Sequence, residues 1–328
     1  MDPTWKPAVG SGAALIQELS FVLYVGFTVI FVVVMALLLH AVFTPARPIR
    51  ARRWLACGGL IFPGTVLCAL LLYSLAVGNA LGSLQGDGAL RFLLDCVSSA
   101  SRSLGLASSG KRAIRVEVNA RQWWWEVKYS DAGAGFALAN ELHIPAGRAV
   151  ELALVTGDVI HSFWVPSLAG KVDMIPGHRN RLVLKADEPG VHRGQCAEYC
   201  GGQHALMALF VVVQPEDEFE RWRAQQASDA VAPASDFLAR GRAAFMRGGC
   251  AKCHTVRGTE ARGDLGPDLT HVGSRYSLGA GVLHNHVGTM AGWIAGTQAI
   301  KSGSLMPDTR AYDGPELRAI AAWLKSLE

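Results

Sequence analysis

Charged residues are scarce in this sequence. Only 18% of its 328 residues are Asp, Glu, Lys or Arg, half are hydrophobic, and the mean hydropathy is +0.23. This composition excludes a disordered chain. The formal net charge of +4 argues against a general nucleic-acid-binding protein, so no nucleic-acid partner is expected. Seven cysteines are too few for a disulfide scaffold, which leaves their spacing as the informative property.

Two long segments lack charge altogether. The first lies between Glu18 and Arg47, and the second follows Arg53. Their apolar cores, at residues 19–43 and 54–77, are longer than the ~20 residues that cross a bilayer as a helix. We therefore expect residues 1–90 to form a two-helix transmembrane hairpin in the lipid bilayer.

The flanks of these segments predict their orientation. The turn between them holds four arginines, Arg47, Arg50, Arg52 and Arg53. The positive-inside rule places such a turn in the cytoplasm, with both chain ends outside. A cleaved signal peptide is the alternative for the first segment, but its apolar core would be shorter and would follow basic residues, of which only Lys6 is present.

The second segment and the residues after it carry no sign of a redox role. Pro63 predicts a kink that neighbouring helices tolerate. Three cysteines are interpreted as small apolar packing residues: Cys57, Cys68 and Cys96. We predict a linker at residues 91–112 because this part of the chain is rich in Gly and Ser. A short amphipathic helix is expected at about residues 89–97.

The pattern changes to that of a β-domain at residues 113–214. Short alternating or β-branched runs are separated by turn residues, as at Pro145 to Gly147. Several such strands in ~100 residues predict an antiparallel sandwich or barrel. The strand candidates are residues 114–118, 151–155, 181–185 and 209–213.

One segment of this domain concentrates metal ligands. Cys196, Cys200, His204 and Met207 lie within twelve residues. Soft sulfur ligands together with imidazole favour copper. Two thiolates four residues apart can bridge two metals, and the second metal then requires another imidazole. His161 is the candidate because it ends an apolar strand just before a loop that contains proline.

Two other interpretations of this segment explain less of it. A Cys196–Cys200 disulfide leaves His204 and Met207 unexplained. Zinc accepts cysteine and histidine, but methionine is a poor zinc ligand. Copper is favoured, and the carbonyl of Glu198, between the two cysteines, can complete the coordination of one metal.

Five segments resemble cytochrome c oxidase subunit II, in the order expected of that family. They are residues 122–126, 139–145, 158–166, 171–177 and 196–207. The resemblance covers about residues 15–225 and implies a cupredoxin with the binuclear copper centre called CuA. It implies that Cys196 and Cys200 bridge both coppers, that His161 and Met207 complete one metal, and that His204 and the Glu198 carbonyl complete the other. It also implies a magnesium ion at the Glu198 carboxylate, shared with oxidase subunit I.

Three consecutive tryptophans lie in one of these segments. In a strand, Trp123 and Trp125 share a face and Trp124 points the other way. Large aromatic side chains most often pack in a core, which is what we expect of Trp124 and Trp125. The resemblance implies that electrons enter the copper centre through Trp123.

The last third of the chain contains the attachment motif of a c-type haem. An acidic stretch and Ala/Pro/Ser residues at 215–234 predict a helix end and a linker before a domain at 235–328. Cys250, Cys253 and His254 follow as Cys-x-x-Cys-His, in which two thioethers fix the porphyrin edge and the histidine lies under the iron. A thioredoxin-like pair would need a surrounding βαβ pattern, and a zinc site a second Cys/His pair at suitable spacing.

Haem iron in electron-transfer proteins typically takes a methionine opposite the histidine. Met306 lies in a loop just before a helix, as in small class I cytochromes c, which residues 266–269 also resemble. Met290 lies in a predicted helix, where it is expected to pack in the core. Met306 is therefore favoured as the axial ligand. The histidines that compete with it are interpreted as surface residues: His271, His284 and His286.

Two helices should complete an all-α class I cytochrome c domain. One is predicted at about residues 236–246. The other starts at Asp313 with a capping-box-like pattern, and Leu317, Ile320 and Leu324 recur in it at helical spacing. We expect the two helices to cross.

These features predict a multidomain membrane protein and its function. It is expected to be the electron-input subunit of a caa-type terminal cytochrome c oxidase, which passes electrons from cytochrome c through haem c and CuA to the haem centres of subunit I. Oxygen would be reduced to water there, coupled to proton translocation, so subunit I and other oxidase subunits are the expected partners. The redox domains should lie on the periplasmic side of a bacterial inner membrane, because covalent haem attachment and open copper sites belong outside the cytoplasm.

Two other functions fit the same motifs. The chain could be the CuA and haem c subunit of a nitric oxide reductase, which gas consumption would distinguish. It could instead be a membrane-anchored copper-delivery protein, which would hold exchangeable copper and have no haem-bearing partner.

Overall fold

A computed structural model describes residues 8–45, 50–85, 114–130, 135–309 and 312–328 of the chain. The chain divides into two units, Gly12–Leu106 on the one hand and Met1–Ser11 with Ala107–Glu328 on the other. The linker predicted at 91–112, the amphipathic helix predicted at about 89–97, and Cys96 lie outside the described residues.

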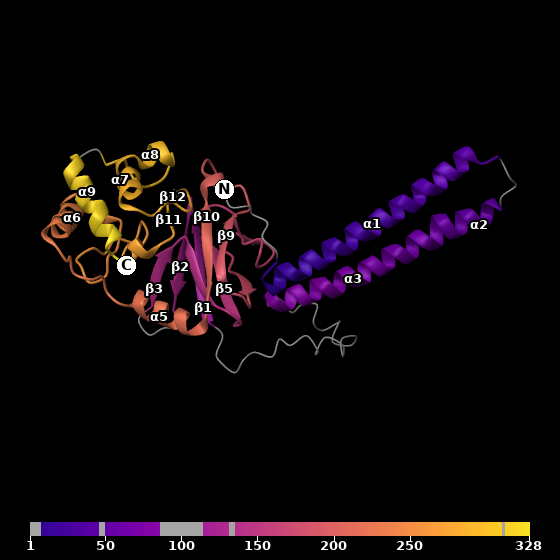
Figure 1. Ribbon diagram of the computed structural model, residues 1–328, viewed down its shortest axis with the longest axis horizontal. Coiled ribbons are helices and arrows are strands. Elements are labelled where there is room, and N and C mark those ends of the chain that lie inside the picture. Colours follow the sequence, from indigo (N-terminus) through magenta and orange to yellow (C-terminus); the bar gives the residue numbers. More distant parts are fainter. Residues whose placement is uncertain (1–7, 46–49, 86–113, 131–134, 310–311) are drawn as a thin grey trace. The chain divides into compact units, whose positions relative to one another are not determined.

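The first unit is a helical hairpin. Helix α1 spans Ser11–Phe43, and the returning helix consists of α2 (Ala51–Ala56), the π-helical turn η1 (Cys57–Ile61) and α3 (Phe62–Gln85). The two run alongside each other in opposite directions (Figure 1). Both are long and apolar enough to cross a membrane. Cys57 and Cys68 are exposed on the hairpin.

The π-helical turn ends just before Phe62 and Pro63, and the proline explains why the helix is wider there. Proline lacks an N–H, and in an α-helix its ring clashes with the carbonyl four residues earlier. A π-helical turn widens the helix there and removes that clash. The kink predicted at Pro63 stays a prediction, and the structure shows one wide turn in the helix before it.

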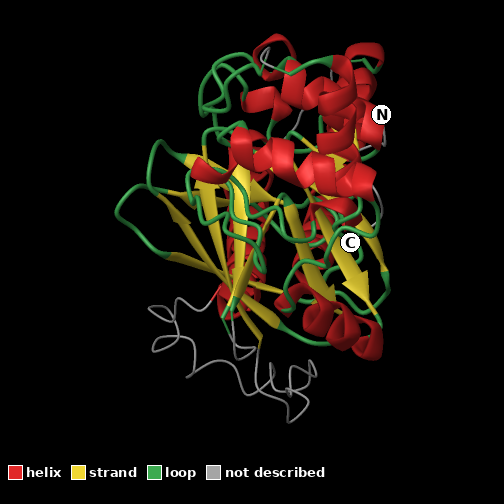
Figure 2. Cartoon of the chain, turned by 90° about the vertical axis from the view of Figure 1, so that its left-hand side faces the viewer, coloured by secondary structure: helices red, strands yellow, loops and turns green. Residues whose placement is uncertain are grey.

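The β-domain is a sandwich of two five-stranded sheets (Figure 2). One sheet has the order β3-β2-β1-β5-β8, and the other has the order β4-β10-β9-β6-β7. The strands are β1 Ile114–Arg121, β2 Trp124–Tyr129, β3 Phe136–Ala139, β4 Glu141–Pro145, β5 Val150–Thr156, β6 His161–Trp164, β7 Val172–Met174, β8 Asn180–Leu184, β9 Gly190–Cys196 and β10 Ala208–Gln214. All four predicted strand candidates are confirmed.

The predicted sandwich is confirmed, but its pairing is not antiparallel throughout, as the prediction of an antiparallel sandwich or barrel had it. β1 pairs with β5, and β4 with β10, in parallel. The reason is the path of the chain. After β3 it crosses to the second sheet to form β4 and then returns to the first sheet as β5, so β1 and β5 are not joined by a hairpin.

Alternating burial along the strands builds the core of the sandwich. Every second residue of β1 and of β5 is buried. Trp125 and Phe163 are fully buried, and their rings pack edge to face with centroids 5.7 Å apart. This pair lies beneath the segment that carries His161, whose ring centroid is 6.4 Å from that of Trp125.

Most of the linker predicted at residues 215–234 is instead a helix. α5 spans Glu216–Ala227. Phe219 on this helix is fully buried in the core of the β-domain, and Trp222 stacks on His143 with ring centroids 3.9 Å apart. Because Phe219 and Trp222 are three residues apart, they share one face of the helix and hold it against the sandwich.

The C-terminal domain is helical. Its helices are α6 Asp236–Arg247, α7 Val287–Ala295, α8 Thr297–Ile300 and α9 Gly314–Lys325, with the 3₁₀ turns η4 Cys250–Lys252 and η5 Val272–Ser274 and a small hairpin of β11 Ser277–Leu278 and β12 Leu283–His284. The predicted crossing of the first and last helices is confirmed, since the rings of Phe245 and Trp323 pack with centroids 5.1 Å apart. The predicted helix start is also confirmed, because Asp313 caps α9 by accepting a hydrogen bond from the amide of Glu316 at 2.7 Å.

Candidate metal and haem sites

The ligand loop, residues 196–207, connects two neighbouring strands. Cys196 ends β9, and Met207 directly precedes β10. A backbone hydrogen bond of 2.9 Å from the amide of Cys196 to the carbonyl of Met207 closes the loop. Gly201 has φ +113°, a conformation that other residues rarely adopt, so it permits the tight turn between the two cysteines and His204.

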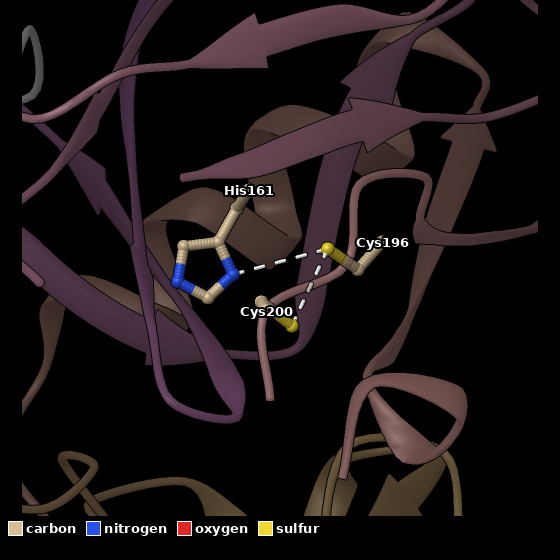
Figure 3. A group of neighbouring side chains, drawn as sticks. All are labelled: His161, Cys196 and Cys200. Carbon is tan, nitrogen blue, oxygen red and sulfur yellow. Dashed lines mark hydrogen bonds between the residues drawn. The ribbon is translucent and has the colours of Figure 1, made fainter. Parts of the chain in front are cut away.

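The loop and His161 bring predicted ligand atoms together, and Figure 3 shows His161, Cys196 and Cys200 of this set. The Sγ atoms of Cys196 and Cys200 are 3.8 Å apart, which is too far for a disulfide. His161 Nδ1 is 3.8 Å from Cys196 Sγ, and His204 Nδ1 is 3.6 Å from Cys200 Sγ. The carbonyl oxygen of Glu198 lies 3.2 Å from Cys196 Sγ, and Met207 Sδ lies 3.9 Å from Cys200 Sγ. How these donors divide between two metals stays a prediction.

His161 is held in the orientation that a metal ligand needs. It begins β6, so the prediction that it ends a strand is wrong. Its side chain is fully buried, and Nε2 lies 2.8 Å from Asp158 Oδ1, which leaves Nδ1 facing the sulfurs. Asp158 in turn accepts hydrogen bonds of 2.6 Å from the amides of Gln122 and Val159. A carboxylate behind a ligating histidine fixes the ring orientation and its tautomer.

The two thiols affect each other's ionisation. Cys200 donates a hydrogen bond to Cys196, and this bond, opposed by burial, lowers the pKa of Cys196 to about 3. The same bond raises the pKa of Cys200. The pair thus retains one proton, and two thiolates at this distance require a cation between them. Two thiolates, two imidazoles and a thioether form a soft donor set that fits copper.

The carboxylate of Glu198 has different neighbours from its carbonyl. It is nearly half exposed, and its nearest charged partner among the described residues is the ammonium of Lys171, at 3.8 Å. The same ammonium lies 3.0 Å from the carboxylate of Asp173, and the magnesium site stays a prediction.

Trp123 lies beside the ligand loop. Its indole Nε1 donates a hydrogen bond of 2.9 Å to the carbonyl of Cys200, which also accepts one of 2.8 Å from Gln122 Nε2. Trp123 lies in the turn before β2 rather than in a strand, so the prediction that it shares a strand face with Trp125 is wrong. It is partly buried against the core of the β-domain. The predicted packing role of Trp125 is confirmed, because it is fully buried.

The haem-attachment motif begins the 3₁₀ turn η4. Cys250 is the first residue of this turn, Cys253 follows it directly, and no disulfide joins them. His254 Nδ1 lies 2.8 Å from the carbonyl of Pro267, so this nitrogen carries the proton and Nε2 remains available as a ligand. Burial lowers the pKa of His254, which favours the neutral imidazole that binds iron. Gly266 leaves room for the ring, since a Cβ there would lie 2.6 Å from His254 Cε1.

The candidates for the sixth haem ligand separate by burial. Met290 is buried in the domain core on α7, as predicted. Met306 is partly buried and packs against the same core from a loop. His284 and His286 are exposed, but the interpretation of His271 as a surface residue is wrong. It is buried, and its two ring nitrogens lie 3.1 and 3.0 Å from the carbonyls of Glu328 and Ser228, which satisfy them inside the protein.

Comparison with known proteins gives both domains a family. Residues 134–214 match the family described as cytochrome C oxidase subunit II, periplasmic domain, and residues 238–328 match the family described as cytochrome c. The chain combines a subunit II periplasmic domain with a cytochrome c domain. The subunit II match contains His161 and the whole ligand loop, and the cytochrome c match contains the haem-attachment motif and Met306.

Relatives of known name agree with this assignment. Over 219 residues the chain is 36% identical to cytochrome c oxidase subunit 2 of Alkalihalophilus pseudofirmus, and over 228 residues it is 31% identical to that of Bacillus sp. strain PS3. The matches cover 67% and 66% of this chain and 63% of each relative. Among solved structures, the periplasmic domain of subunit II from Bradyrhizobium japonicum is 29% identical, with 35% of this chain and 95% of that chain covered and a TM-score of 0.34.

The subunit II and cytochrome c domains contain functional residues that sequence reasoning missed. Asp158 orients His161, and its position three residues before that histidine was the available signal. The carbonyl of Pro267 orients His254. It lies in residues 266–269, for which the sequence predicts a resemblance to class I cytochromes c but no contact with the histidine. Lys301, in the cytochrome c domain, contacts the subunit II domain and gave no sequence signal at all.

Proposed function

We propose that this chain is the electron-input subunit of a terminal cytochrome c oxidase. The observation that carries the proposal is the joint presence, in one unit of the chain, of a copper-type donor set and a haem-attachment motif. When bound, a copper pair and a haem c would each accept and release one electron at a time. The chain's own residues would hold these groups and set the distance between them.

The proposed ligands divide between the two domains. For copper they are His161, Cys196, Glu198 (through its carbonyl), Cys200, His204 and Met207. For haem c they are Cys250 and Cys253 as thioether positions, with His254 and Met306 as axial ligands. Asp158 and the carbonyl of Pro267 would keep the imidazoles of His161 and His254 in their ligating orientation.

Trp123 would carry electrons toward the copper ligands. Its indole is hydrogen-bonded to the carbonyl of Cys200, a proposed bridging ligand. On its other side lies the loop that leads to Met306, because a Cβ built on Gly303 would touch the indole ring at 3.4 Å. One aromatic ring thus touches both segments that carry ligands.

The two apolar helices would anchor the chain in a bacterial inner membrane, with both redox domains on the periplasmic side. Oxidase subunit I and further oxidase subunits would be its partners, and cytochrome c or a related protein its donor. Oxygen reduction in subunit I, coupled to proton translocation, and a shared magnesium ion at Glu198 complete the proposal.

Purification with its membrane partners tests the proposed function. We expect two coppers and one haem c per copy of the chain, a mixed-valence copper signal in electron paramagnetic resonance, and oxygen consumption with reduced cytochrome c. Nitric oxide consumption in place of oxygen consumption would support the reductase alternative. A single exchangeable copper with no haem-bearing partner would support the copper-delivery alternative.

A further inference from the structure

Lys301 is a buried lysine at the contact between the β-domain and the C-terminal domain. It follows helix α8, and only 3% of its surface is exposed. Its Nζ donates hydrogen bonds of 2.7 Å to the carbonyls of Trp123 and Leu206 in the β-domain and one of 2.8 Å to the carbonyl of Gly279 in its own domain. An ammonium group has three protons, and all three are used.

The partners of Lys301 belong to the segments that carry the proposed ligands. Trp123 is hydrogen-bonded to the carbonyl of Cys200, and Leu206 directly precedes Met207. On the other side, Lys301 begins the loop that leads to Met306. This one side chain therefore connects the ligand loop of the β-domain with the axial-ligand loop of the C-terminal domain.

Neighbouring hydrogen bonds continue the same contact. The amide of Ala208 on β10 donates to the carbonyl of Ala280 at 3.0 Å, one residue after the Gly279 carbonyl that Lys301 binds. Gln203 Nε2 in the ligand loop donates to the carbonyl of Ser302 at 2.8 Å. Together with the bonds of Lys301, these bonds hold the turn of the β11–β12 hairpin and the start of the Met306 loop against the ligand loop and the first residue of β10.

The chemistry of this contact makes Lys301 difficult to replace. Removing its amino group would leave the carbonyls of Trp123 and Leu206 without a donor, and an unsatisfied buried acceptor costs more than the bond itself contributes. Burial lowers the pKa of Lys301 to about 7, and the charge of Cys200 acts in the opposite direction. No carboxylate lies within ion-pair distance of Lys301 among the residues described, and its acceptors are neutral.

We propose that Lys301 is the positioning residue that docks the C-terminal domain on the ligand loop and so keeps the Met306 loop against Trp123. The electron-transfer part of this inference rests on the proposed function, whereas the docking part does not. Because the acceptors are neutral carbonyls, docking should respond weakly to salt, in contrast to an encounter held by surface ion pairs.

The test uses Lys301→Met in the full chain, which keeps the aliphatic stem and removes the donors. The matched control is Lys325→Met, because among the described residues the side chain of Lys325 donates hydrogen bonds only to Gly273 and Glu328, within the C-terminal domain. Amide hydrogen exchange is followed at Ala208, whose bond crosses between the domains, and at Phe210, whose amide donates to Asn140 within the β-domain. The rate of electron transfer from haem to copper is measured in the assembled complex.

We expect Lys301→Met to raise exchange at Ala208 by at least about tenfold, equivalent to 1.4 kcal/mol, with exchange at Phe210 unchanged. Transfer from haem to copper should slow, while the optical spectra of both centres stay as in the wild type and Lys325→Met changes neither readout. Unchanged exchange at Ala208, or transfer at the wild-type rate, would overturn the inference. If the wild type itself shows no transfer, the proposed function fails, and the exchange at Ala208 still decides whether Lys301 docks the domains.

Discussion

The crossing of α6 and α9 predicts a large effect for one small substitution, Gly241→Ala. A Cβ at Gly241 would lie 2.0 Å from the carbonyl oxygen and 2.5 Å from the carbonyl carbon of Ala319 on α9. Non-bonded carbon atoms pack at about 3.5 Å or more. The two helices would therefore have to move apart by roughly 1 Å or more to remove the overlap. The displaced atoms are backbone, which has no rotamer by which to escape.

The expected magnitude follows from two opposing effects. Overpacking costs about 1–3 kcal/mol, and the forced backbone shift places this site at the upper end. Replacing glycine by alanine inside a helix returns up to about 1 kcal/mol. A net loss of about 2 kcal/mol corresponds to a fall of about 8–16 °C in the melting temperature of a domain of this size.

The assay is thermal unfolding of the full chain, followed by haem absorbance so that only the C-terminal domain is observed. The control is Gly292→Ala on α7, where a Cβ would meet nothing within 4 Å. It should raise the melting temperature slightly through helix propensity alone. If Gly241→Ala melts at or above the wild-type temperature, the close approach of α6 to α9 is not present in the protein.

Two further predictions concern proposed ligands, and a third concerns the electron path through Trp123. Cys200→Ser should lower the copper content from two per chain to at most one, because a serine oxygen is a poor ligand for copper that thiolates otherwise bridge; two coppers by metal analysis would contradict this. Met306→Ala should convert the haem to a high-spin or water-ligated form in the optical spectrum, and Met290→Ala should not; an unchanged spectrum in Met306→Ala would exclude it as the axial ligand. Trp123→Phe removes the hydrogen bond to the Cys200 carbonyl and should slow transfer from haem to copper with the copper spectrum intact, so a wild-type rate would remove Trp123 from the path.

The position of the C-terminal domain changes how the role of Trp123 is understood. The resemblance implied a tryptophan that receives electrons at the surface of the β-domain. In the structure Trp123 is partly buried, and its carbonyl accepts a hydrogen bond from Lys301 of the C-terminal domain. Because the C-terminal domain contacts Trp123, we expect the attached haem to be the immediate donor.

The sequence by itself determined the features that depend on neighbouring residues. Cys196 to Met207 and Cys250 to His254 are short segments, so their spacing alone limits the chemistry they can perform. The apolar helices and the alternating strands follow from periodicity and from the length of uncharged runs. The helix that begins at Asp313 was predictable because a cap acts within one turn.

Tertiary structure decided the features that join distant parts of the chain. Asp158 binds the ring of His161 at the start of a strand instead of its end, and the parallel pairing of β1 with β5 depends on the chain crossing between sheets. The sequence predicts a helix end and a linker for the acidic stretch because most of its residues are polar. In the structure it is helix α5, one face of which buries Phe219. Lys301 lies 178 residues from Trp123, and a lysine bound to backbone carbonyls leaves no mark in the sequence, since every residue has such a carbonyl.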